Sequence, residues 1–89
     1  MMRIAAITIR MYAPWVHSLK EKRMVVKSLL AKIQNKFNVS AAETEEQDTH
    51  QTIVIGVAAV AANPSQADSV MDHVIQFVEE NSEAQIWDV

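Results

Sequence analysis

Apolar and polar residues alternate along residues 3–12 of the chain. A strand directs successive side chains to opposite faces, so this pattern predicts a strand with one fully apolar face. Pro14 is expected to end it, because proline lacks the N–H that a strand ladder needs. One face holds Ala5, Ile7, Ile9 and Met11, and the other holds Ile4, Ala6, Thr8, Arg10 and Tyr12.

Helical spacing follows over residues 18–37, where apolar residues recur at intervals of three and four. Ser18 and Glu21 have the spacing of a capping box, in which Ser18 accepts from the N–H of Glu21 and Glu21 reaches back to the N–H of Ser18. Asn38 is expected to end the helix in a left-handed conformation. The predicted apolar stripe is Leu19, Val26, Leu29, Leu30, Ile33 and Phe37.

The middle of the chain predicts a hairpin. Residues 39–44 favour a short strand, residues 45–50 are a polar connection, and residues 51–62 form a longer strand without clear alternation, which is typical of burial on both sides. Gly56, the only glycine, lies inside that second strand and indicates a bulge or a close backbone approach.

A second helix is predicted from Asn63, a natural N-cap, and Pro64, which fits the first helical position, to about Asn81. "AQIWDV" is then a short last strand. This order predicts a single α+β domain over residues 1–89. Its fold is a ferredoxin-like βαββαβ sandwich, with a four-stranded antiparallel sheet, the first and third strands at its centre and both helices on one face. Leu29, Ile33, Val74 and Ile7 are expected in the core.

Composition excludes several kinds of chemistry. The chain has 89 residues and no cysteine, so it has no disulfide, thiolate metal site or cysteine nucleophile. One glycine excludes a glycine-rich phosphate loop. The three histidines, His17, His50 and His73, lack metal-ligand spacing. We therefore expect a non-enzymatic protein without a cofactor. Its longest apolar run, of ten residues, is about half of a membrane span, so we expect a cytoplasmic protein that makes no membrane contact.

The net charge of −3 conceals a segregation of charge along the chain. Residues 1–36 hold all eight basic residues and one acid, which gives +7, whereas residues 37–89 hold ten acids and no lysine or arginine, which gives −10. One interpretation is a basic surface that binds an anion. The other is internal attraction between the two halves of a small fold.

Lys20, Arg23 and Lys27 form the centre of a basic stripe on the first helix, flanked by Lys22, Lys32 and Lys36. Such a stripe suits the phosphate backbone of an RNA or a ribosomal particle. The alternative is a solvated helix face without a ligand.

The sheet face away from the helices has no cover within the chain. Ile4 and Ala6 of the first strand, with Val54 and Val60 of the third, are candidates for a homodimer or higher-oligomer interface, or for a small-ligand site. The other parity of the third strand, Ile53, Ile55 and Val57, is also apolar.

The segments "HSLKEKRMVVKSLLAKIQNKFNVSAAE", "IVIGVAAVA" and "VIQFVEEN" resemble the YlxP-like family of small bacterial proteins of unknown function. "SLKEKR" on the first helix and "FNVSAAE" on the second strand are the most specific elements. The resemblance implies a ferredoxin-like fold. Genes of this family often lie beside those of translation initiation and ribosome-binding factors, which implies an association with translation. No catalytic residues carry over.

Overall fold

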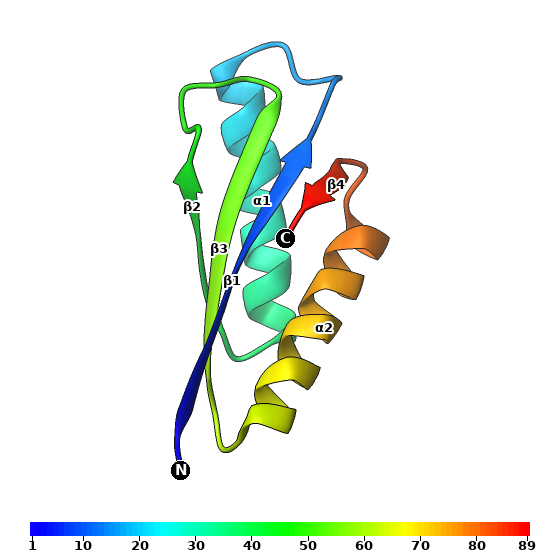
Figure 1. Cartoon of the computed structure of the whole chain (residues 1–89). Helices are drawn as coiled ribbons and strands as arrows, with labels where there is room; N and C mark the ends of the chain where they lie inside the picture. The colour runs from blue at the N-terminus through cyan, green and yellow to red at the C-terminus, as the bar shows by residue number, and fades with distance from the viewer.

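Two long central strands dominate the computed structural model, which describes all 89 residues. The chain forms β1 (Arg3–Tyr12), α1 (Leu19–Lys36), β2 (Ser40–Glu45), β3 (Thr52–Ala61), α2 (Pro64–Asn81) and β4 (Gln85–Asp88). Its four strands form one antiparallel sheet in the order β2-β3-β1-β4, and both helices lie on the same face of it (Figure 1). The predicted ferredoxin-like α+β fold is confirmed.

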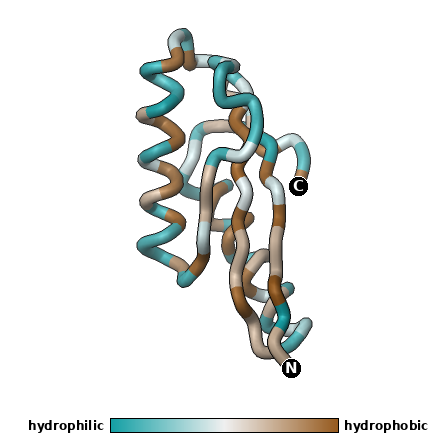
Figure 2. Tube along the Cα trace, turned by 90° about the vertical axis from the view of Figure 1, so that its left-hand side faces the viewer, coloured by the Kyte–Doolittle hydropathy of each residue, from teal (hydrophilic) through white to brown (hydrophobic).

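The core lies between the helices and the sheet. It includes Ile9 and Met11 of β1, facing Ile55 and Ile53 of β3 in the strand register. Leu29, Ile33 and Val74 are buried as predicted, whereas Ile7 is only half-buried. In Figure 2, hydrophilic and hydrophobic segments alternate along α1, as expected for a helix with one buried stripe.

The strand register decides which side chains of β3 face outward. Ile4 pairs with Val60 and Ala6 pairs with Ala58, so the even-numbered residues of both strands share the open face. Ile53, Ile55 and Val57 therefore occupy the core side, where all three are buried. The burial of β3 on both sides, inferred from its lack of alternation, holds only for its first half.

Short outer strands leave the ends of the central pair uncovered. β1 and β3 pair over ten residues each, but β4 pairs only with residues 10–12 of β1, and β2 pairs with residues 54–58 of β3. The molecule measures 45 × 22 × 20 Å along its principal axes. In Figure 1, β4 lies beside the upper end of β1 only, and the lower part of β1 has β3 as its single strand neighbour.

Local signals in the sequence were mostly correct. Asn63 caps α2 by accepting the N–H of Gln66 at 2.9 Å, and Pro64 is the first residue of that helix. Gly56 was predicted to mark a bulge or a close backbone approach, but the structure shows a close side chain instead, because a Cβ there would lie 2.9 Å from Thr44 Cγ2. The prediction for Asn38 was wrong. α1 ends with Phe37 as its extended C-cap, and Glu46 is the only non-glycine residue with positive φ.

Candidate functional site: the first helix and its neighbours

The start of α1 is fixed by reciprocal side-chain caps. Ser18 Oγ accepts a hydrogen bond from the backbone N–H of Glu21 at 3.1 Å, as the capping box predicts. Glu21 Oε1 accepts from the backbone N–H of His17 at 3.1 Å, one residue before the predicted donor. The first bond satisfies an N–H group that the helix start leaves free, and the second ties the residue before the N-cap to the first turn of α1.

Lys22 begins the buried face of α1 at its N-terminal end, with 0% of its surface exposed. The prediction that it flanks the exposed basic stripe is therefore wrong. Lys22, Val26, Leu29 and Ile33 follow one another at intervals of four, three and four residues, which places Lys22 in line with three buried residues. That spacing was the signal in the sequence. It was missed because lysine was assigned to the solvated face on account of its charge.

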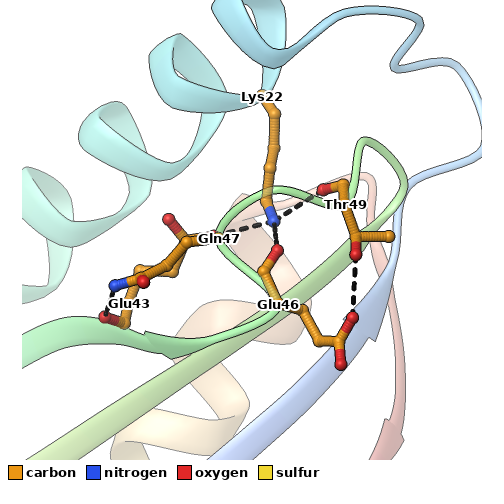
Figure 3. A network of polar contacts seen from close by, with 5 residues as sticks. All are labelled: Lys22, Glu43, Glu46, Gln47 and Thr49. Carbon is orange, nitrogen blue, oxygen red and sulfur yellow. Dashed lines mark hydrogen bonds and ion pairs between the residues drawn. The ribbon is translucent and has the colours of Figure 1, made fainter.

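Three oxygens surround the Lys22 ammonium group (Figure 3). Nζ donates hydrogen bonds to the backbone carbonyls of Glu46 and Thr49, the latter at 2.8 Å. It also lies 2.8 Å from Glu43 Oε2, whose side chain is 15% exposed. This last contact is a close ion pair without hydrogen-bond geometry, since the buried Oε2 accepts no directed hydrogen bond. The electrostatic attraction to Nζ offsets the desolvation cost of burying that carboxylate.

The connection between β2 and β3 depends on this lysine. Glu46 has a left-handed backbone, with φ of 57°, and its carbonyl also accepts the backbone N–H of Thr49 at 3.1 Å. Thr49 Oγ1 donates to Glu46 Oε2 at 2.8 Å. Lys22 thus closes a turn that has no glycine, and it joins that turn to the first helix.

Lys20, Arg23 and Lys27 project from the outer face of α1, and all three are exposed. None of them forms an ion pair. Arg23 and Lys27 also border a groove of about 440 Å³ between α1 and β2, whose lining includes the apolar side chains of Val26 and Leu30. The structure therefore brings the predicted stripe together as a row of free cations beside an apolar groove.

Lys32 and Lys36 lie on the other flank of α1, away from this row. Lys32 borders a groove of about 310 Å³ that Glu83 also lines, and Lys36 borders a hollow that it shares with Glu80. These two lysines therefore lie near acids of the second half of the chain. In the groove beside the row of Lys20, Arg23 and Lys27, the only acidic residue is Glu43. Its carboxylate already forms an ion pair with Lys22.

The four interface candidates on the open face differ in accessibility. Ile4 and Val60 are each 70% exposed and lie opposite one another, and Ala6 is also exposed. Val54 lies on the same face but is 0% exposed. The reason is Arg10, its register partner on β1, whose Nη2 donates to Glu45 Oε2 at 2.9 Å.

Glu45 lies opposite Val54 from the β2 side, so the Arg10–Glu45 pair crosses the sheet above Val54. Arg10 Nε also lies 3.7 Å from Asp88 Oδ2 of β4. Arg10 thereby links the two outer strands and covers Val54. Ile4 and Val60 remain exposed in the lower half of the open face, and Tyr12 remains 42% exposed at its upper end.

The histidines and the acidic residues do not form a metal site in this structure. His17, His50 and His73 are all exposed. No group of three or more histidine, aspartate or glutamate side chains has the arrangement of a metal site. Neither helix has the length and apolar character required to cross a membrane.

The fold and this surface define a small ferredoxin-like protein whose first helix bears a row of free cations. A family model described as "Protein of unknown function (DUF503)" matches residues 4–89, so the chain belongs to that family. The chain is also 45% identical over 62 residues to a Bacillus subtilis (strain 168) protein called "Uncharacterized protein YlxP". That alignment covers 70% of this chain and 67% of the relative. The resemblance to the YlxP-like family is confirmed.

Proposed function

We propose that this protein is a non-enzymatic accessory factor that binds RNA or a ribosomal particle through the exposed row Lys20, Arg23 and Lys27. The observation that carries the proposal is that these three cations are exposed on one helix face without a carboxylate partner. Lys20 and Lys27 are separated by about 10 Å along the helix axis. A row of this kind favours a polyanion over a single small anion.

Internal attraction explains only part of the charge segregation. All three ion pairs of the chain join a basic residue of residues 1–36 to an acid of residues 37–89, but they involve only Arg10 and Lys22. Six of the eight basic residues remain without an ion pair. Three of these form the exposed row, and like charges three and four residues apart on a helix do not stabilise it. A ligand that carries phosphates would supply the missing counter-charge.

The YlxP-like resemblance supports ribosomal RNA as the first class to test, because genes of that family often neighbour those of translation factors. The direct experiment is cosedimentation of the purified protein with ribosomal particles at low salt, before and after nuclease treatment. We expect cosedimentation that nuclease abolishes. Absence of cosedimentation at low salt, together with absence of binding to free RNA, would refute the proposal.

A second candidate function is self-association through the open sheet face. It is favoured by the register pair Ile4 and Val60, each 70% exposed, with Ala6 beside them. Because Val54 is covered, Ile4, Ala6 and Val60 are the three of the four candidates that are accessible to a partner. Val60→Lys would place a charge at its centre. If the face carries an oligomer, this variant is monomeric by light scattering where the unaltered protein is not.

A further inference from the structure

β1 has a free edge. β4 pairs only with residues 10–12, and β3 lies on the other side of β1, so residues 3–9 have no strand neighbour on the β4 side. Ala13 donates its N–H to the carbonyl of Gln51 at 2.8 Å, which makes these two a hydrogen-bonded pair at the end of the β1–β3 ladder. Because such pairs alternate along antiparallel strands, Ile4, Ala6 and Thr8 direct their N–H and C=O groups to the free side.

This edge lacks the devices that usually keep strand edges from pairing. Residues 4–9 contain no lysine, proline or acid, and the β1–β3 register is continuous there. The opposite edge of the sheet, β2, is treated differently. Gln34 of α1 donates its Nε2–H to the carbonyl of Ala41 at 2.9 Å, so a side chain already occupies part of that edge. Of the two edges, β1 is the one open to another strand.

Charges beside the two edges also differ. Phe77 of α2 contacts Phe37, at the end of α1, ring to ring, with centroids 5.5 Å apart, and this marks the α2 flank that faces α1. Asp68, Asp72 and Glu79 fall on the opposite flank at 100° per residue, on the side of the free β1 edge. All three are exposed, and none has an ion-pair partner. Arg3, at the start of the same edge, is also exposed and unpaired.

We propose that the free edge of β1 binds the same edge of a second copy of this chain. The two β1 strands run antiparallel about a two-fold axis close to Ala6, so that Ile4 of each copy lies opposite Thr8 of the other. The two sheets become one of eight strands. Arg3 of each copy then lies over the acidic flank of α2 in its partner, and this contact occurs twice. The inference rests on the self-association proposed above, but it places the contact at the free edge of β1 instead of the open face of the sheet.

Sedimentation equilibrium of the full chain and four variants tests this geometry. Ala6→Pro removes an N–H that no strand of the same chain uses, and we expect it to give a monomer with an unchanged circular dichroism spectrum. Arg3→Glu should weaken dimerisation roughly tenfold, since it affects two surface ion pairs in each dimer. The triple variant Arg3→Glu, Asp72→Lys, Glu79→Lys should restore it. Lys36→Glu changes the same charge on α1 and should leave dimerisation unchanged.

Cysteine crosslinking gives a second measurement that does not depend on how Ala6→Pro folds. The chain has no cysteine, so single substitutions are unambiguous. Ala6→Cys should form a disulfide-linked dimer on oxidation, whereas Ala42→Cys, an exposed alanine on β2, should not. A chain that is monomeric at high concentration overturns the edge pairing and the face candidate together. A dimer lost in Val60→Lys, but kept in Ala6→Pro and Arg3→Glu, overturns the edge pairing and supports the face.

Discussion

Lys22 Nζ and Glu43 Oε2 lie 2.8 Å apart in the layer between α1 and the sheet, and the lysine is fully buried. Lys22 belongs to the segment "SLKEKR" and Glu43 to the segment "FNVSAAE", the two elements that most specifically suggested the YlxP-like resemblance. The structure therefore brings the two most characteristic segments of the chain into direct contact. Their shared role is to fix the first helix to the β2–β3 turn.

Removal of the buried ammonium group should be costly. Lys22→Met leaves the buried Glu43 carboxylate without its counter-charge and removes the side-chain donor to the carbonyls of Glu46 and Thr49, so we expect a loss of about 3–5 kcal/mol in the free energy of unfolding. Urea denaturation measures this loss. The double variant Lys22→Met, Glu43→Leu should recover part of it, because the unpaired carboxylate is removed as well. A loss under about 1 kcal/mol would mean that the network contributes little.

Core residues on the same helix face should behave as ordinary buried aliphatics. Leu29→Ala and Ile33→Ala should each lower the free energy of unfolding by about 2–5 kcal/mol, since both side chains are buried in the main cluster. Met24→Ala, an exposed residue of the same helix, is the matched control and should change stability by about 0.5 kcal/mol or less. Equal denaturation midpoints for all three variants would contradict the phase of α1.

Gly56 should respond to the residue that lies over it. A Cβ at this position would lie 2.9 Å from Thr44 Cγ2, so Gly56→Ala is expected to destabilise the protein. After Thr44→Ala the obstacle is gone, and Gly56→Ala should then stabilise by about 0.5–1 kcal/mol, because alanine loses less backbone entropy than glycine. Thermal unfolding of the two single variants and the double variant shows whether the sign reverses. The same sign in both backgrounds would exclude the contact as the cause.

Periodicity and capping residues were sufficient to predict most of the fold. The alternation over residues 3–12, the Ser18 cap and the Asn63–Pro64 start each act within a few residues, so they are readable from local sequence. The burial of Lys22 could have been predicted from its helical spacing to the apolar stripe. It was not predicted, because a charged residue was assigned to the solvated face. Nothing local indicates which carbonyls would surround it, since Glu46 and Thr49 depend on how the hairpin folds back onto α1.

The coverage of Val54 and the free edge of β1 could not be predicted, for a different reason. Arg10 reaches Glu45 across an intervening strand, which requires the order β2-β3-β1-β4 together with the exact register. The free edge depends on the register in which β4 pairs with residues 10–12 of β1 only. Both features depend on distances between segments far apart in the sequence, whereas the stripe Lys20, Arg23 and Lys27 depends on helical spacing alone and was predicted as a group.

The salt dependence of RNA affinity tests the central claim, that the row on α1 binds phosphates. The variant Lys20→Ala, Arg23→Ala, Lys27→Ala should fold normally, because each change is at the surface and alters stability by about 0.5 kcal/mol or less.

RNA titrations at several salt concentrations measure the slope of log affinity against log salt. Each lost contact should reduce that slope by about 0.7 for single-stranded RNA, so the triple variant should lose about 2. Within this comparison, Arg23→Ala with Lys27→Ala should show most of the loss, and the matched pair Lys32→Ala with Lys36→Ala should show little. Equal slopes for the unaltered protein and the triple variant would contradict the account.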